Sequence, residues 1–151
     1  MIDGVRITEL RVIPDDRGYL MEMLRADSPD FEKFGQVYLT VVYPGVVKAW
    51  HSHTKQTDNF VCVSGMAKVG LYDAREDSPT RGETMTVVMG WQRQLRLTIP
   101  PGVCHGFTPV GNEPATIINI PTEVYDHQNP DEQRRPWDDP EIGYDWGVKN
   151  G

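Results

Sequence analysis

Two histidines one residue apart, His51 and His53, form the strongest chemical pattern in the chain. Side chains alternate along a strand, so an H-x-H pair presents both imidazoles on one face if the segment is extended. Asp58 follows after a short turn, and His105 stands in a second glycine-flanked segment, IPPGVCHGF. Three imidazoles and one carboxylate are typical ligands of a first-row transition metal. The residues therefore predict that His51, His53, Asp58 and His105 bind one divalent ion (Zn, Ni, Mn or Fe), with unrelated surface histidines as the alternative.

Short strands are the elements expected to position these residues. Apolar runs recur at short intervals, separated by the turns DDRG, P-G, S-G, DSPTRG, PPG and GNEP. Many short strands between Gly/Pro turns indicate an all-β sandwich or small barrel. The expected strands cover 6–14, 19–24, 36–43, 48–53, 59–64, 67–73, 83–89, 93–99, 105–110 and 115–121. One helix is predicted over 28–34, with Ser28 as its cap and Pro29 at its first position.

Composition limits the class of protein. The chain has 151 residues, enough for one domain with a real core, and a formal net charge of −7. That charge argues against a general nucleic-acid or anionic-membrane surface, although a few Arg and Lys residues can still hold a small anion. No signal peptide and no long apolar run is evident, which predicts a cytoplasmic protein with Cys62 and Cys104 as free thiols. A disulfide is the alternative for the two cysteines.

The segment after Tyr125 is polar and proline-rich, yet it contains Trp137, Tyr144 and Trp146. Three large aromatic residues in such a tail predict that it packs across the sheet as an irregular strap. Trp50 lies between Ala49 and His51, so strand alternation points it away from the histidines and into packing. The run Arg134-Arg135 is predicted to be a solvated face rather than a phosphate site.

Several motifs occur together between Asp15 and Trp146: DDRGYLME, GVVKAWH, DAREDSPTRG, IPPGVCHGF, TEVY and WDDPEIGYDW. In this order they resemble the dTDP-4-dehydrorhamnose 3,5-epimerase family. The resemblance implies a cupin-type jelly-roll with a short N-terminal hairpin and an irregular C-terminal tail. It also implies a homodimer that acts on a nucleotide sugar.

The resemblance also assigns roles, and it exposes departures from the family pattern. His51 falls on the general base that removes a proton beside a ketone. The carboxylate that orients this base is expected beyond Gly151, outside the chain. The family lysine that stabilises the enolate falls on Asp58, and the tyrosine acid falls on Asn119. Tyr125, which matches a second family tyrosine, is then the best remaining proton donor, with a packed aromatic residue whose hydroxyl meets water as the alternative.

The predicted substrate contacts come from the same comparison: Arg17, Glu22, Gln36, Lys48 and Asn119. Lys48 replaces a family arginine, so a point charge stands where a bidentate fork would grip diphosphate. Arg17 and Glu22 have an equally simple interpretation as an exposed turn pair.

The function predicted from the sequence is epimerisation or ketoisomerisation of a nucleoside-diphosphate 4-keto-6-deoxyhexose by enolisation, with His51 and Tyr125 as catalytic residues. A metal held by the four predicted ligands would assist by polarising the ketone. Two alternatives remain at this point. One is a metal-dependent cupin that acts on another small molecule, and the other is a non-catalytic cupin that binds sugar nucleotides.

Overall fold

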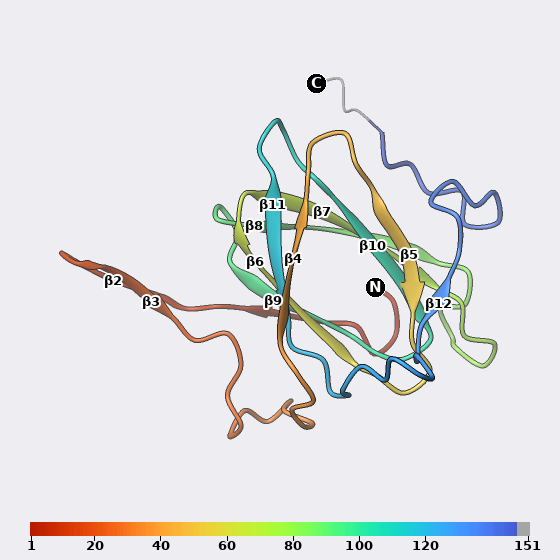
Figure 1. Ribbon diagram of the computed structural model, residues 1–151, viewed down its shortest axis with the longest axis horizontal. Coiled ribbons are helices and arrows are strands. Elements are labelled where there is room, and N and C mark those ends of the chain that lie inside the picture. The colour runs from red at the N-terminus through yellow and green to blue at the C-terminus, as the bar shows by residue number, and fades with distance from the viewer. Residues whose placement is uncertain (148–151) are drawn as a thin grey trace.

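The computed structural model describes residues 1–147, and it contains strands, turns and loops (Figure 1). Two five-stranded antiparallel sheets make up the body of the molecule. The turns and short apolar runs predicted an all-β sandwich or small barrel, and the family resemblance implied a jelly-roll; the structure is a jelly-roll sandwich. No helix forms within these 147 residues, and therefore none there is long and apolar enough to cross a membrane.

The first sheet has the strand order β1-β9-β6-β11-β4. Its strands are β1 (Arg6–Glu9), β4 (Tyr38–Val42), β6 (Asp58–Ser64), β9 (Leu95–Ile99) and β11 (Ala115–Asn119). The second sheet has the order β12-β5-β10-β7-β8. Its strands are β5 (Lys48–Ser52), β7 (Met66–Asp73), β8 (Thr84–Gly90), β10 (Val103–Pro109) and β12 (Gln133–Arg134). Neighbours in sequence thus change sheets repeatedly, which brings distant segments together.

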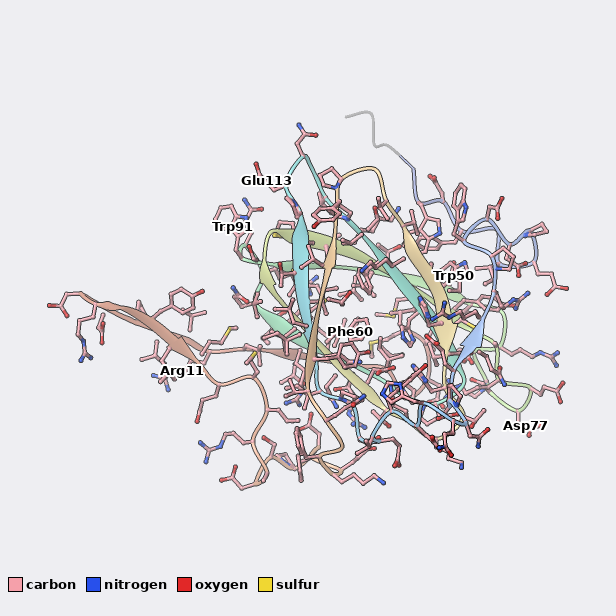
Figure 2. All side chains as sticks on the ribbon, in the orientation of Figure 1. Arg11, Trp50, Phe60, Asp77, Trp91 and Glu113 are labelled. Atoms are coloured by element: carbon pink, nitrogen blue, oxygen red, sulfur yellow. The ribbon has the colours of Figure 1, made fainter. Side chains whose placement is uncertain are left out.

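Apolar side chains from the facing sheets form one core. Phe60, labelled in Figure 2, lies between the sheets and meets Phe107 edge to face at 5.8 Å between ring centroids. Such edge-on pairs are favoured by the aromatic quadrupole. The fully buried aliphatic members from the strands are Val42, Val69, Leu71, Val87, Leu95, Leu97, Ile99, Val103 and Ile117. Buried residues alternate with less buried ones along β11, as expected for a half-buried strand, whereas β9 is buried along its whole length.

A hairpin of β2 (Val12–Asp15) and β3 (Gly18–Met21) extends away from both sheets as an arm (Figure 1). The predicted strand over 6–14 is therefore divided, with β1 in the first sheet and β2 in this arm. Ile13, Tyr19 and Leu20 on the arm are exposed. A two-stranded ribbon with exposed apolar residues is a marginal structure alone, so the arm has surface suited to contact with another molecule.

The predicted helix over 28–34 is wrong. Single-turn hydrogen bonds form there, from Phe31 N to the Ser28 carbonyl and from Ser28 N to the Arg25 carbonyl, but they do not continue. Asp30 instead pairs with the nearly buried Arg96 on β9, and Glu32 accepts from the Thr57 hydroxyl at 3.0 Å. These tertiary contacts thus keep the segment in a non-helical conformation despite its local helix signals.

The tail packs on the outer face of the second sheet, as predicted. Trp50 is buried and contacts the rings of Tyr144 and Trp146, at centroid distances of 5.4 and 4.9 Å. A Cβ at Gly70 on β7 would lie 2.8 Å from the Trp146 ring, so glycine there permits this close approach. Trp137 differs from the prediction because its side chain is exposed, although its carbonyl accepts the Trp146 indole N–H at 3.1 Å.

Candidate active site

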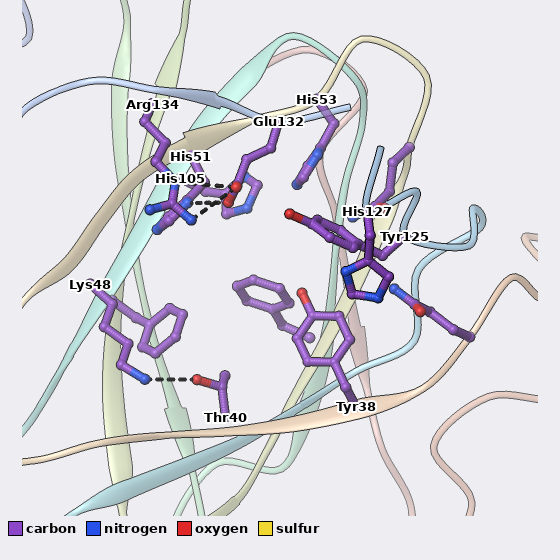
Figure 3. A pocket seen from close by; sticks show the side chains of 14 residues that line it. Tyr38, Thr40, Lys48, His51, His53, His105, Tyr125, His127, Glu132 and Arg134 are labelled. Atoms are coloured by element: carbon purple, nitrogen blue, oxygen red, sulfur yellow. Dashed lines mark hydrogen bonds and ion pairs between the residues drawn. The ribbon is translucent and has the colours of Figure 1, made fainter. Parts of the chain in front are cut away.

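A cavity of about 540 Å³ opens between β4 of the first sheet and β5 and β10 of the second (Figure 3). Its wall combines imidazole, phenol, ammonium and guanidinium groups with two phenylalanine rings. The lining residues are Gln36, Tyr38, Thr40, Lys48, His51, His53, Gln56, Phe60, His105, Phe107, Tyr125, His127, Glu132 and Arg134. An apolar floor with a few convergent polar groups is typical of a small-molecule site.

His51 and Glu132 form a hydrogen-bonded pair in this cavity, with 2.7 Å between Nδ1 and Oε1. β12 pairs with β5 so that Arg134 lies opposite His51, which brings the preceding Glu132 beside the imidazole. Because the carboxylate accepts from Nδ1, Nε2 of His51 is left as the basic nitrogen. The resemblance placed the orienting carboxylate beyond Gly151, but the structure supplies Glu132 from within the chain.

Arg134 reinforces this pair from the other side of the carboxylate. Its guanidinium donates to Oε2 of Glu132 at 3.0 and 3.1 Å. Burial alone would raise the pKa of Glu132, but the bonds from Arg134 and His51 outweigh burial and hold this pKa below its usual value. The carboxylate therefore stays ionised. Arg134 also lines the cavity, and its side chain is 71% exposed, in keeping with the predicted solvated face.

Asp131 holds the tail in the position that brings Glu132 to His51. Its carboxylate accepts from the backbone N–H groups of Thr54, Lys55 and Gln56 at 2.9–3.2 Å, and from the Thr54 hydroxyl at 2.5 Å. Burial opposes ionisation, yet these four donors lower the pKa of Asp131 to about 2. The turn between β5 and β6 is thus tied to the segment that precedes β12.

His53, Asp58 and His105 form a second, more deeply buried cluster. Their ligand atoms lie within 4.8 Å of one another, with Oδ2 of Asp58 at 3.4 Å from Nε2 of His53 and 3.5 Å from Nε2 of His105. His51 is not part of this group, and its ring centroid is 6.4 Å from that of His105. The structure thus brings three of the four predicted metal ligands together and turns the fourth toward Glu132.

The donor chemistry of this cluster is compatible with a cation. Nδ1 of His53 donates to the Asp131 carbonyl, and Nδ1 of His105 donates to the Val103 carbonyl at 3.1 Å. Burial lowers the pKa of His105, which favours the neutral imidazole. In the neutral tautomers, two Nε2 lone pairs face one carboxylate oxygen, the arrangement that a metal ion would satisfy. His53, Asp58 and His105 would hold such an ion, which would act as a Lewis acid.

Asn119 lies beneath the cavity and is fully buried. Its amide nitrogen donates to Oδ1 of Asp58 at 2.6 Å and to the Tyr38 hydroxyl at 2.9 Å, while its oxygen accepts from the Asn59 N–H at 3.0 Å. Asn119 therefore supports the wall and does not itself line the cavity. Asp58 is likewise absent from the lining.

The other predicted substrate contacts divide into two groups. Gln36 and Lys48 line the cavity, and the Lys48 ammonium donates to the Thr40 hydroxyl at 3.0 Å. Arg17 and Glu22 belong to the arm and its base, outside this cavity, where they pair with Asp15 and Arg25 at 2.5 and 2.6 Å. Arg17 and Glu22 could therefore contact such a cavity only in a second molecule.

The tyrosine predicted as proton donor, Tyr125, lines the cavity and meets the His127 ring edge to face at 4.9 Å. Sequence reasoning missed four lining residues that carry chemistry: Tyr38, His127, Glu132 and Arg134. The acidic pair followed by a basic pair in DEQRR was the available signal for Glu132, but its partner His51 is 81 positions away.

A jelly-roll whose inner wall carries the H-x-H pair and a third histidine defines a cupin-type protein. Residues 1–150 match the sequence model of one protein family, described as dTDP-4-dehydrorhamnose 3,5-epimerase. The chain belongs to this family of sugar-nucleotide epimerases. The sequence resemblance is thereby confirmed.

Relatives extend the comparison to glycan synthesis. The chain is 46% identical over 149 residues to the spore coat polysaccharide biosynthesis protein SpsL of Bacillus subtilis, covering 99% of each sequence. It is also 46% identical over 150 residues to a probable low-salt glycan biosynthesis epimerase, Agl13, of Haloferax volcanii, covering 98% of this chain and 96% of the relative. A crystal structure of a dTDP sugar isomerase from Desulfovibrio desulfuricans G20 superposes with a TM-score of 0.92 at 38% identity, covering 98% of this chain and 94% of the other.

Proposed function

We propose that this protein epimerises a nucleoside-diphosphate 4-keto-6-deoxyhexose by enolisation, with His51 as the base. The observation that carries the proposal is the His51–Glu132 pair, set at 2.7 Å in the wall of a cavity between the sheets. Family membership and the two glycan-biosynthesis relatives favour a sugar nucleotide as the substrate.

The chemistry begins at a carbon beside the ketone. Nε2 of His51 accepts the proton from that carbon, and the electrons of the C–H bond move to the ketone oxygen to form an enolate. Glu132 accepts a hydrogen bond from Nδ1–H and stabilises the imidazolium that results. Return of a proton to the opposite face of the same carbon completes the inversion.

The enolate requires an environment that tolerates negative charge. Asp58 replaces the family lysine, but its side chain is 1% exposed and its Oδ1 is engaged by Gln56 and Asn119. Its charge is therefore turned away from the cavity. Lys48 and Arg134 supply positive charge on the cavity wall, suited to a diphosphate or a developing oxyanion.

The test uses purified protein with dTDP-4-keto-6-deoxyglucose in deuterated water, followed by NMR. We expect deuterium to enter at a carbon beside the ketone and an epimer to accumulate, and both to be lost in H51N. If the wild-type protein binds the nucleotide sugar without exchange, a non-catalytic binding role is favoured. If it neither binds nor exchanges, a cupin acting on another small molecule is favoured.

A metal-assisted variant of the same reaction is the second candidate. The observation that favours it is the pair of Nε2 atoms facing Oδ2 of Asp58. Elemental analysis of protein purified without added metal tests it, with D58A as the matched variant. About one equivalent of Zn, Ni, Mn or Fe in the wild type and its loss in D58A would support the site, whereas metal-free protein with full activity would exclude an essential ion.

We further propose that the arm of β2 and β3 reaches a second copy of the chain in a homodimer. Its exposed Ile13, Tyr19 and Leu20, together with Arg17 at its tip, support this role. Sedimentation should show a dimer at micromolar concentration, and the double variant Ile13→Asp, Leu20→Asp should sediment as a monomer. A stable wild-type monomer would contradict the proposal.

A further inference from the structure

Tyr38 and Asn119 are register partners on the neighbouring strands β4 and β11. The resemblance places the family's tyrosine acid at Asn119, which cannot donate a proton to carbon near neutral pH. The structure sets the Tyr38 hydroxyl 2.9 Å from the Asn119 amide nitrogen. A phenol therefore stands directly beside the position where the family pattern expects one, but it comes from the adjacent strand.

The hydrogen bonds of Asn119 determine which way the Tyr38 proton points. The Asn59 backbone N–H can only donate, so the Asn119 atom that it meets is the oxygen. The other terminal atom is therefore nitrogen, and its two protons go to Asp58 and to the Tyr38 oxygen. The Tyr38 oxygen thus accepts a hydrogen bond from the Asn119 amide, and the Tyr38 O–H remains available to donate into the cavity.

Tyr38 and His51 approach the cavity from different sheets. His51 lies on β5 of the second sheet, and Tyr38 lies on β4, the edge strand of the first. Both line the cavity (Figure 3). Inversion needs a base on one face of the sugar ring and an acid on the other, and groups from facing sheets meet that requirement.

We propose that Tyr38 is the catalytic acid that reprotonates the enolate on the face opposite His51, and that Asn119 is its positioning residue. This inference rests on the proposed function. The phenol O–H bond breaks, a C–H bond forms with the enolate electron pair, and the negative charge passes to the phenolate oxygen. The Asn119 amide already donates to that oxygen and stabilises it. Proton exchange with water restores the phenol, while His51 returns its own proton to solvent.

The surroundings keep Tyr38 protonated between turnovers. Burial raises the pKa of the Tyr38 hydroxyl above its usual value, the Asn119 bond opposes this effect, and the charges of Asp58 and Glu132 add to it. Tyr125 belongs to the loop after β11 and not to either sheet, and its ring stacks edge-on with His127. We therefore assign Tyr125 to closing the cavity around the sugar.

The experiment compares deuterium exchange with inversion in Tyr38→Phe, Tyr125→Phe and Tyr43→Phe, using dTDP-4-keto-6-deoxyglucose in deuterated water. Tyr43 follows β4 and is 66% exposed outside the cavity, so Tyr43→Phe is the matched control and should retain both rates. In Tyr38→Phe, His51 can still remove a proton and return deuterium to the same face. We expect exchange to persist within about tenfold while epimer formation falls about a hundredfold or more.

Tyr125→Phe should lower exchange and inversion together, because a looser cavity affects both. The Tyr38 assignment is overturned if Tyr38→Phe forms epimer within tenfold of the wild type, or if Tyr125→Phe is the variant that separates exchange from inversion. It is also overturned if Tyr38→Phe loses exchange and inversion equally. Absence of exchange in the wild-type protein would refute the proposed function itself, and with it this assignment.

Discussion

Two histidine–carboxylate groups lie close together in this molecule, and they differ in burial and in which imidazole nitrogen meets the carboxylate. In the His51–Glu132 pair, Nδ1 meets the carboxylate and the side chains are 28% and 18% exposed. In the buried cluster, Nε2 of both His53 and His105 meets Asp58, and the three side chains are 12%, 5% and 1% exposed. The first arrangement leaves Nε2 of His51 available as a base. In the second, Nε2 of His53 and Nε2 of His105 both face the Asp58 carboxylate. The same residue types therefore suit a base at His51 and suit structural support or a metal site at Asp58.

Substitution of His51 should have the largest effect on activity. We expect H51N to lower kcat/KM about 10³- to 10⁴-fold because the general base is lost, while the free energy of unfolding changes by about 1 kcal/mol or less. Steady-state kinetics and urea denaturation measure the two quantities. A variant that keeps a tenth of the activity would show that His51 is not the base.

Substitution of Asp58 should lower mainly the stability of the protein, whereas substitution of His51 lowers mainly its activity. D58A leaves the amide donors of Gln56 and Asn119 buried without their acceptor, so we expect the free energy of unfolding to fall by about 3–5 kcal/mol. Urea denaturation with an unchanged m-value checks the loss. A cost under about 1 kcal/mol would mean that the cluster does not support the fold as its burial indicates.

Glu132 should matter for activity more than for stability. E132Q keeps the shape but removes the charge that stabilises the imidazolium, so kcat should fall about 10- to 100-fold, with KM nearly constant. E141Q is a suitable control because Glu141 is an exposed acid on the same tail, paired with Arg135. Equal activity of E132Q and wild type would reduce the His51–Glu132 bond to a structural contact.

Asp131 should show the smallest effect, and that effect depends on pH. Its pKa of about 2 in the folded protein lies below the value near 3.9 of an unfolded chain, so its ionised form stabilises the fold above about pH 4. This contribution is lost as pH falls toward 2. We expect D131N to cost about 1–2 kcal/mol at pH 7, with the difference from wild type vanishing near pH 2 in acid denaturation followed by circular dichroism. A difference that persists unchanged at pH 2 would contradict this origin.

The class of fold and the shared face of His51 and His53 could be predicted from the sequence. Glycine and proline turns ended each strand locally, and strand alternation placed His51 and His53 on one wall and Trp50 on the other. The free state of Cys62 and Cys104 also followed from composition and is confirmed. These features depend on neighbours within a few positions, which is why a single sequence carries them.

The hydrogen-bond partners of these residues depend on the pairing of distant strands. Glu132 reaches His51 because β12 pairs with β5, and Tyr38 meets Asn119 because β4 pairs with β11 across 81 positions. The segment 28–34 stays open because Arg96 from β9 takes Asp30 as its partner. Strand order and register create such contacts, and no local periodicity records them. The sequence therefore identified the histidines. The pairing of distant strands placed the Glu132 carboxylate at Nδ1 of His51 and the Tyr38 phenol on the facing sheet.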